Sequence, residues 1–421
     1  RDFGMPRLLL CLALAACLSV AWAGVVVEKV PVAGTSGWKV SNEKLSFTIL
    51  NLGATIHSLH VPDRSGKQRD IVLGFEDAEN YKVQGPYFGA IVGRVANRLN
   101  GGKFDIDGKK HQVALNDGAN SLHGGKVGFD KKVWDVKEVK DGVVLSLESK
   151  DGEEGYPGNV KVTAHYSLKG SILTLRMTAT TDSPTPVSLA QHSYFNLAGH
   201  EMGSILGTKL CLKATGYMPV KSDSIPTGQI IPLAEHSEMD FSSTQLVGDK
   251  MNDMARKRSL PVPFDSDACK PVSKAADAPE SAPDAPGGPT SGAPLGFDHN
   301  YVLHRPNPVM RFLIGIFRGL LRPLRPVATV TDPKSGTQMR LLSDAPGVQF
   351  YSGNFLNGEA GKGGVKYQQH AGLCLETQTF PDSIGSDPAS DVGKGATRIL
   401  RPGQTYRHTV VYKFETVECE K

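Results

Sequence analysis

The sequence predicts an all-β protein, built as a large sandwich of antiparallel sheets. In many short stretches apolar residues alternate with polar ones, which is the pattern of a strand with one buried face. Turns that contain glycine separate these stretches, and helical periodicity is scarce in the first 240 residues. The chain has 421 residues, of which 39% are hydrophobic and 21% charged, so it can bury a substantial core.

Two tight hairpins are predicted early in the chain. In each, two short strands flank an Asp-Gly pair, a dipeptide that favours two-residue hairpin turns. The first joins residues 104–106 to 109–113 through Asp107-Gly108, and the second joins 134–139 to 143–149 around Asp141-Gly142.

Three longer alternating series predict the main strands of the sandwich. Because side chains alternate between the two faces of a strand, the members of each series share one buried face. The series are Val160, Val162, Ala164, Tyr166 and Leu168; Leu173, Leu175, Met177 and Ala179; and Tyr406, His408, Val410, Tyr412 and Phe414.

The N-terminal segment has the three parts of a secretory signal peptide. A basic start at residues 5–7 is followed by an apolar run, 8–20, and by Ala21-Trp-Ala23. The apolar run is too short for a comfortable membrane span, and the alternative is a buried helix. We therefore expect residues 1–23 to be an N-terminal extension and signal peptide, 24–421 to be the folded domain, and the protein to be secreted or to enter the secretory pathway.

Charge and cysteine usage exclude some classes of function. A formal net charge of +4, without a basic stripe interleaved with aromatics, gives no support for nucleic-acid binding. Four cysteines follow the signal peptide: Cys211, Cys269, Cys374 and Cys419. None belongs to a C-x-x-C motif, so neither a zinc site nor a redox motif is indicated. Their pairing stays open, and buried free thiols are equally compatible with the spacing.

Two segments break the β pattern. Residues 261–296 contain eight prolines among Ala, Ser, Asp and Gly, so we expect a disordered insertion. Residues 305–326 place apolar residues at helical spacing among arginines, which predicts a short basic amphipathic helix. Such a helix could make weak contact with an anionic membrane surface, or it could cap the sandwich with its arginines in solvent.

Several polar stretches place titratable groups beside glycines and aromatics. They contain Asn97 and Arg98 in 89–98, His123 in 120–125, His192 in 191–197, Gln349 in 347–356 and Glu376 in 372–378. Taken singly, most have structural explanations: a histidine before Gly-Gly is commonly a turn residue, and an arginine can pair with a surface carboxylate. Glu376 lies in an apolar strand beside Cys374, where a carboxylate needs a partner or a cleft.

Together and in this order, these motifs resemble the aldose 1-epimerase (galactose mutarotase) family. The resemblance extends from about residue 40 to residue 415, on both sides of the proline-rich segment, so we interpret that segment as an insertion within one domain. It implies the galactose mutarotase-like β-sandwich, with a free sugar in an open cleft. The motifs are Gly93-Arg-Val-Ala-Asn-Arg98, Leu122-His-Gly-Gly125, His192-Ser-Tyr-Phe-Asn-Leu197, Phe297-Asp-His-Asn300, Gly347-Val-Gln-Phe-Tyr351 and Leu375-Glu-Thr-Gln-Thr-Phe-Pro-Asp382.

The resemblance also implies roles for particular residues in the interconversion of α and β anomers. His192 would donate a proton to the ring oxygen, and Glu376 would take the proton of the anomeric hydroxyl. The residues that would hydrogen-bond the sugar are Asn97, Arg98, His123, Asp298 and Gln349, with His123 also placed to polarise the ring oxygen.

One acid and one base suffice for this reaction, so no metal or other cofactor is expected. For this cycle we expect Glu376 to be ionised while His192 is protonated. One departure from the family pattern is Gln191, where members commonly have Asn before the histidine.

Three alternatives differ from this hypothesis in observable ways. A secreted, non-catalytic carbohydrate-binding protein would lack His192 or Glu376, and both are present. An epimerase of sugar 6-phosphates would need a basic phosphate cluster, and a glycosidase would need two carboxylates flanking the scissile bond. The sequence does not rank glucose, galactose or pentoses as substrates, and it carries no signal for an oligomeric state.

Overall fold

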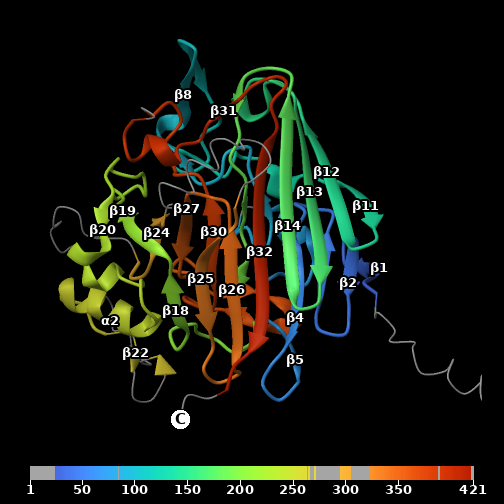
Figure 1. Ribbon diagram of the computed structural model, residues 1–421, viewed down its shortest axis with the longest axis vertical. Coiled ribbons are helices and arrows are strands. Elements are labelled where there is room, and N and C mark those ends of the chain that lie inside the picture. Colours follow the sequence, from blue (N-terminus) through green and yellow to red (C-terminus); the bar gives the residue numbers. More distant parts are fainter. Residues whose placement is uncertain are drawn as a thin grey trace, which may run out of the picture.

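Three antiparallel sheets build the fold in the computed structural model, which confirms the predicted all-β class (Figure 1). The structure describes residues 24–83, 85–262, 264–265, 270–271, 294–304, 323–386 and 389–418. The predicted signal peptide, residues 1–23, lies outside these ranges and stays a prediction. In the described part, no helix is long and apolar enough to cross a membrane.

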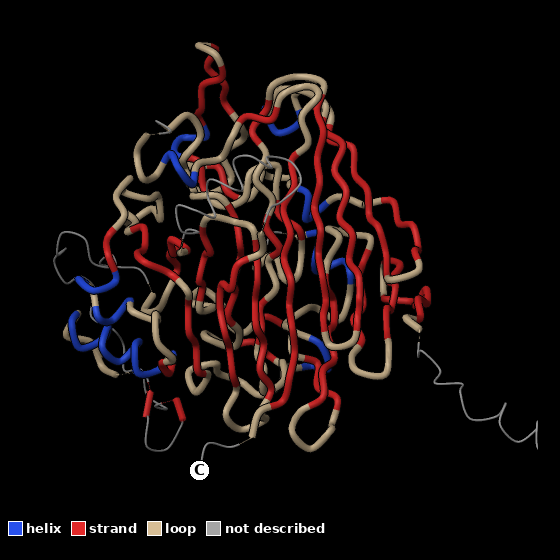
Figure 2. Tube along the Cα trace, in the orientation of Figure 1, coloured by secondary structure: helices blue, strands red, loops and turns tan. Residues whose placement is uncertain are grey.

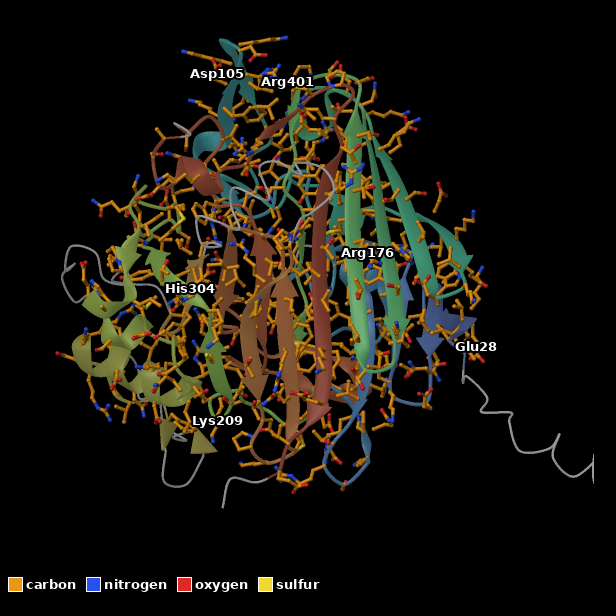
Figure 3. All side chains as sticks on the ribbon, viewed as in Figure 1. Glu28, Asp105, Arg176, Lys209, His304 and Arg401 are labelled. Atoms are coloured by element: carbon orange, nitrogen blue, oxygen red, sulfur yellow. The ribbon has the colours of Figure 1, made fainter. Side chains whose placement is uncertain are left out.

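The largest sheet has nine strands, and its long strands β13, β14 and β32 run side by side along the molecule (Figure 1). Their side chains alternate between buried and exposed, as the sequence predicted. Arg176 projects from the solvent-exposed face of β14 (Figure 3). In sheet order the strands are β11 (Asp135–Val139), β12 (Gly142–Ser149), β13 (Val160–Lys169), β14 (Ile172–Thr181), β32 (Tyr406–Thr416), β26 (Thr337–Ser343), β25 (Arg325–Thr331), β18 (Lys209–Leu212) and β21 (Gln245–Leu246).

A six-stranded and a five-stranded sheet complete the framework. The six-stranded sheet consists of β17 (Tyr194–Phe195), β30 (Leu373–Gln378), β27 (Gly347–Tyr351), β24 (Asp298–Leu303), β19 (Ala214–Met218) and β20 (Ile231–Pro232). The five-stranded sheet consists of β1 (Val26–Val32), β2 (Thr35–Ser41), β3 (Ser46–Leu50), β4 (Ile56–Pro62) and β5 (Gln68–Asp70).

Short strand pairs and helices lie around these sheets (Figure 2). The pairs are β6 (Ile91–Val92) with β16 (Ala190–Gln191), β7 (Arg98–Leu99) with β10 (Ser121–Leu122), β8 (Lys103–Ile106) with β9 (Lys109–Gln112), β15 (Thr185–Pro186) with β31 (Ile399–Leu400), β22 (Phe264–Asp265) with β23 (Lys270–Pro271), and β28 (Glu359–Ala360) with β29 (Lys366–Tyr367). The α-helices are α1 (Ala78–Lys82) and α2 (Val247–Lys257). Single 3₁₀ turns cover Asn100–Gly102, Phe129–Lys131, Glu153–Gly155, Leu233–Glu235, Ser237–Met239, Lys362–Gly364 and Gly393–Gly395.

Aromatic contacts join the three sheets into one core. Tyr412 of the nine-stranded sheet lies 5.5 Å, centroid to centroid, from Phe195 of the six-stranded sheet. Tyr166 lies 6.4 Å from Phe47 of the five-stranded sheet. All four side chains are buried, so the nine-stranded sheet packs against both of the others.

The structure confirms both predicted hairpins and corrects the limits of the two irregular segments. Phe264, inside the predicted insertion 261–296, is buried in the core and belongs to a strand that pairs with β23. Arg325 and Pro326, at the end of the predicted helix 305–326, are the first residues of strand β25, because the antiparallel pairing with β26 begins at these residues. Residues 272–293 and 305–322 lie outside the described residues.

Helix α2 was not predicted. Val247, Met251 and Met254 lie on its buried face, three to four residues apart, while charged residues cover the remainder. The helix has only 11 residues and directly precedes the proline-rich segment, so the sequence gives too short a periodic stretch to predict it. In Figure 1 it lies at the lower left, beyond the edge of the sheets and beside β22.

Candidate active site

The six-stranded sheet has one apolar face and one polar face, and the polar face forms the floor of the site. Leu373, Leu375 and Phe350 point into the core. On the opposite face, strand register aligns Glu376 of β30 with Gln349 of β27, and Gln349 with Asn300 of β24. Side chains directly opposite one another in such pairs have Cβ atoms roughly 4.5–5.5 Å apart. The sequence pattern of buried strands thus brings three polar side chains into one row.

A cleft of about 270 Å³ opens over this floor. It is lined by six of the seven residues that the sequence analysis singled out: Asn97, Arg98, His123, His192, Asp298 and Glu376. The cleft also contacts aromatic residues to which no role was assigned: Tyr87, Tyr194, Tyr351 and Phe355. A concave site with apolar rings and a few converging polar groups is typical of a small-molecule site.

Gln349 does not line the cleft and instead lies behind Asp298, which does. Its side-chain Nε2 donates a hydrogen bond to Asp298 Oδ1 at 2.7 Å, and the residue is 4% exposed. In this structure Gln349 therefore orients Asp298 rather than facing the cleft itself. The registers between β24, β27 and β30 decide this, and such long-range pairing cannot be read from spacing along the chain.

The two-stranded sheet of β7 and β10 positions Arg98, which opens β7, and the adjoining residues Asn97 and His123. The backbone N–H of Asn97 donates to His123 Nδ1 at 3.2 Å, and the His123 N–H donates to the Asn97 carbonyl at 3.0 Å. Asn97, His123 and neighbouring Tyr87 all have positive φ angles, of 62°, 51° and 59°. Such conformations cost about 1–3 kcal/mol each and cluster at functional sites, so the surrounding fold holds these side chains in place.

The glycine after His123 is required by close backbone contact. Gly124 has φ 94°, and a Cβ atom there would lie 1.9 Å from the carbonyl oxygen of Gly93. The Gly-Gly pair that looked like an ordinary turn is thus needed to bring His123 against the loop that precedes Asn97.

Backbone and amide bonds hold His192 in place. Its N–H donates to the Ala90 carbonyl at 2.9 Å, and its carbonyl accepts from Gly89 N at 3.0 Å. Gln191, which replaces the family's usual Asn, donates through Nε2 to Gly89 O and to Ser193 Oγ, at 2.9 and 2.8 Å. The longer side chain of Gln191 thus hydrogen-bonds residues 89 and 193, on either side of the backbone that carries His192.

His192 and Glu376 face each other at the centre of the site. His192 Nε2 lies 3.6 Å from Glu376 Oε1, and both side chains are buried. The other ring nitrogen, Nδ1, lies 3.7 Å from Cys374 Sγ. The ring of Tyr194 stacks on His192 with centroids 5.2 Å apart. Two proton-transfer groups therefore share one cleft. Tyr194 contacts the face of the histidine ring, and Cys374 contacts its Nδ1 edge.

Burial shifts both groups toward their neutral forms. It lowers the pKa of His192 to about 4. Burial, and after it the nearby charge of Asp298, raises the pKa of Glu376 well above its usual value, against an opposing effect of Arg98. In the substrate-free cleft both groups thus favour their neutral forms, opposite to the ionised Glu376 and protonated His192 expected of the reacting pair. Sequence reasoning missed this because burial is a property of the folded structure.

Arg98 and Asp298 carry the remaining charge in the cleft. Arg98 Nε donates to Asp117 Oδ2 at 2.7 Å, so its position is fixed by a partly exposed carboxylate. Burial raises the pKa of Asp298, whereas Arg98 and the hydrogen bond from Gln349 act in the opposite direction. A guanidinium and a carboxyl group at one cleft can bind neighbouring hydroxyl groups as donor and acceptor.

His123, His192 and Glu376 have the residue types and spacing of a metal site, with potential ligand atoms within 4.8 Å of one another. The hydrogen bonding of His123 argues against that use. Its Nδ1 accepts from Asn97 N–H, so in the neutral ring Nε2 carries the proton and cannot ligate an ion. Burial, and after it the neighbouring His192, lowers the pKa of His123 well below its usual value, which favours this neutral form. His123 thus offers the cleft an N–H donor.

The cysteines that the structure describes, Cys211 and Cys374, are buried and free. Cys269 and Cys419 lie outside the described residues. A disulfide between Cys211 and Cys374 is thus excluded, and Cys374 instead contacts His192 through its sulfur.

Comparison with known proteins agrees with this geometry. A family model described as Aldose 1-epimerase matches residues 37–413. Galactose mutarotase of Bos taurus is 37% identical over 378 residues, which cover 90% of this chain and 93% of that protein. The Homo sapiens galactose mutarotase is 36% identical with the same coverage, and aldose 1-epimerase of Escherichia coli (strain K12) is 30% identical, covering 89% of this chain and 93% of that protein.

Two solved structures share the fold at lower identity. An aldose epimerase homologue from C. elegans superimposes with a TM-score of 0.71 at 23% identity, covering 93% of this chain and 100% of its own. A galactose 1-epimerase from Lactobacillus acidophilus gives 0.68 at 24%, covering 94% and 99%. The alternative of a non-catalytic sugar-binding protein has no support among these relatives. The chain belongs to the aldose 1-epimerase family and is an isomerase that interconverts the anomers of sugars.

Proposed function

We propose that the protein catalyses mutarotation of free aldohexoses, with Glu376 and His192 as the acid–base pair. The observation that supports this proposal is their placement in one cleft, 3.6 Å apart between Nε2 and Oε1. The names of the relatives make galactose the first substrate to test. Glucose, another aldohexose, is the second. The hydroxyl groups of the sugar would bind Arg98, Asp298 and the His123 N–H.

The proposed reaction moves two protons and breaks one bond. Ionised Glu376 takes the proton of the C1 hydroxyl while protonated His192 gives its proton to the ring oxygen. The C1–O5 bond breaks, C1 becomes an aldehyde, and rotation about C1–C2 presents its other face. Reclosure runs the same transfers backward, so that His192 takes the O5 proton and Glu376 returns one to O1.

The pKa directions support this sequence rather than oppose it. A buried carboxylate with a raised pKa is a strong base, and a buried imidazolium with a pKa lowered to about 4 is a strong acid. After ring opening the pair is Glu376–H and neutral His192, which is the state that burial favours. Burial thus lowers the energy of the ring-opened intermediate relative to the ring-closed complex.

Polarimetry of freshly dissolved α-D-galactose and α-D-glucose tests the proposal. The wild-type protein should speed the relaxation of optical rotation, and Glu376→Gln should reduce kcat by about 10²–10⁴-fold, the range for one positioned proton transfer. Glu238→Gln is the matched control, because Glu238 is equally buried but lies outside the cleft. A Glu376→Gln protein as active as the wild type would refute the role of the base.

We also propose that residues 1–23 direct the protein into the secretory pathway. The basic start, the apolar run 8–20 and the Ala21-Trp-Ala23 ending support this proposal. Expression of the full chain in a secreting host, followed by N-terminal sequencing of the product, tests it. A product that begins near Gly24 supports it, and an uncleaved protein retained in the cytoplasm contradicts it.

A further inference from the structure

The polar row on the six-stranded sheet continues behind Glu376, away from the residues that line the cleft. Asn300 is aligned with Gln349, and Gln378 follows Glu376 by two residues on the same face of β30. Asn300 and Gln378 are each 2% exposed, and neither lines the cleft. Neither residue has a role in the mechanism proposed above.

Unpartnered polar atoms concentrate in this group. Among the buried atoms without a hydrogen-bond partner in the described part of the chain, six belong to this group: Asn300 Nδ2 and Oδ1, Gln378 Nε2 and Oε1, Gln349 Oε1, and Glu376 Oε2. Buried polar atoms in folded proteins are nearly always paired, with protein groups or with ordered water. A cluster of unpaired donors and acceptors on three adjacent strands therefore indicates a polar ligand that is not part of the chain.

Gly347 lets the side chains of this group come close to the backbone of β27. It is paired with Gln378 across β27 and β30, and its neighbour on the other side is Val302 of β24. A Cβ atom on Gly347 would lie 2.4 Å from Asn300 Oδ1 and 3.1 Å from the ring of Phe380. The absence of a side chain thus lets Asn300 Oδ1 and the ring of Phe380 approach the backbone of β27 between Asn300 and Gln378.

We propose that Asn300, Gln378 and Gln349 form, around Gly347, a buried binding site for ordered water that hydrogen-bonds Glu376 Oε2. A buried water needs two to four polar partners, and these amides supply both donors and acceptors. Asn300 and Gln378 are then positioning residues, because they act on the base through water and not on the sugar. This inference rests on the proposed role of Glu376.

The site has a directional effect on catalysis. Water held by two amides donates to the carboxylate, and a donor stabilises the ionised form of Glu376. The charged base becomes more populated in the ring-closed complex, and its Oε1 stays directed at His192. Loss of the water should lower kcat with KM unchanged, and it should move the alkaline limb of the pH profile to higher pH.

The test combines a high-resolution crystal structure of the wild-type protein with kinetics of three variants. Gly347→Ala places a Cβ atom 2.4 Å from Asn300 Oδ1 and so displaces that amide, and Gln378→Leu removes two hydrogen-bonding atoms at similar size. Gly37→Ala is the matched control, since its Cβ would lie 2.9 Å from Val32 Cγ2 in the five-stranded sheet, where no site residue lies. Thermal unfolding of each variant separates loss of stability from loss of rate.

The expected results are water density in contact with Asn300, Gln378 and Glu376, and a kcat reduced about tenfold in both site variants, as for one lost bond to a charged group. Gly37→Ala should keep the wild-type profile even where it unfolds earlier. Amides of Asn300 and Gln378 bonded directly to each other without water, or site variants with wild-type kcat and alkaline limb, would overturn the inference. Failure of the proposed function would instead appear as full activity of Glu376→Gln, while the water density of the wild-type protein would remain interpretable.

Discussion

The cleft and the cluster around Lys362 bury titratable groups in opposite ways. Lys362 is 7% exposed, and its ammonium donates to Asp70 Oδ2 at 2.5 Å, to His57 O at 2.8 Å and to Val72 O at 2.9 Å. Its three protons thus have three acceptors. In the cleft, Glu376 is still more deeply buried, at 2% exposed, yet Oε1 lies 3.6 Å from His192 and Oε2 is unpaired in the described part of the chain.

This difference distinguishes a structural group from a reactive one. Burying a charge is costly unless it is paired and hydrogen-bonded, and the three acceptors around Lys362 offset part of that cost, although burial still lowers the pKa of its ammonium. Glu376 is left uncompensated, and its pKa rises well above the usual value for that reason. A buried group that the protein leaves unpaired is available to a substrate.

Breaking the structural cluster should have the largest effect on stability. In Lys362→Met, Asp70 and two carbonyls lose their donor, so we expect a loss of about 3–5 kcal/mol in the free energy of unfolding, measured with urea. The folded fraction should keep its kcat. Lys394→Met, which removes an exposed partner of Asp391, is the control and should cost about 0–1 kcal/mol. Equal losses in the two variants would mean that burial of Lys362 contributes nothing.

The pH profile of kcat/KM tests the state of the cleft pair. The reactive His192–Glu376 pair carries one proton in total. When His192 binds a second proton, with a pKa of about 4, no group of the pair is left to accept the proton of the sugar. The acid limb should therefore fall near pH 4 and not near the pKa of about 6.5 of a free histidine. Loss of the last proton gives an alkaline limb above the usual pKa of a carboxyl group. An acid limb near 6.5 in a protein that is fully folded at pH 5 would contradict this assignment.

Much of the framework could be predicted from the sequence, because local patterns determine it. The alternation from Tyr406 to Phe414 and the Asp107-Gly108 turn are sufficient to predict β32 and the β8–β9 hairpin. Pairs of two-residue strands such as β6 with β16 could not be predicted, because distant segments must first be brought together. Helix α2 was missed for its short length.

The residues of the candidate site were predicted from motifs, but their packing, backbone angles and protonation states were not. Six of the seven residues line the cleft, but the position of Gln349 behind Asp298 depends on the pairing of β24 with β27. The positive φ of Tyr87 depends likewise on tertiary contacts. The neutral resting state of the His192–Glu376 pair was not predicted, because no local pattern encodes how deeply Glu376 is buried.

Glu376 should reduce stability at the pH where the enzyme works. Its folded-state pKa is raised, so the folded protein binds more protons than the unfolded one above the ordinary carboxyl pKa, and stability falls as pH rises through that window. Each pKa unit corresponds to about 1.4 kcal/mol. Glu376→Gln removes this dependence, so its advantage in Tm over the wild type should be larger at pH 8 than at pH 5. A difference in Tm that is constant with pH would show that the carboxyl group stays ionised.

The smallest effect on activity and stability is expected at Gln191, whose hydrogen bonds fix the backbone next to His192. Its Oε1 accepts from Tyr412 OH at 3.3 Å, while its Nε2 donates to Gly89 O at 2.9 Å. The shorter side chain in Gln191→Asn cannot span both partners, so one hydrogen bond is lost, at a cost of about 0.5–1.5 kcal/mol. The backbone bonds between His192 and residues 89–90 remain, and kcat should therefore fall by less than about tenfold. Tyr412→Phe removes the same hydrogen bond from the other side and should match this effect in polarimetry and thermal unfolding. A hundredfold loss in Gln191→Asn alone would instead make the amide part of the proton-transfer machinery, since no structural bond of this kind accounts for a change of that size.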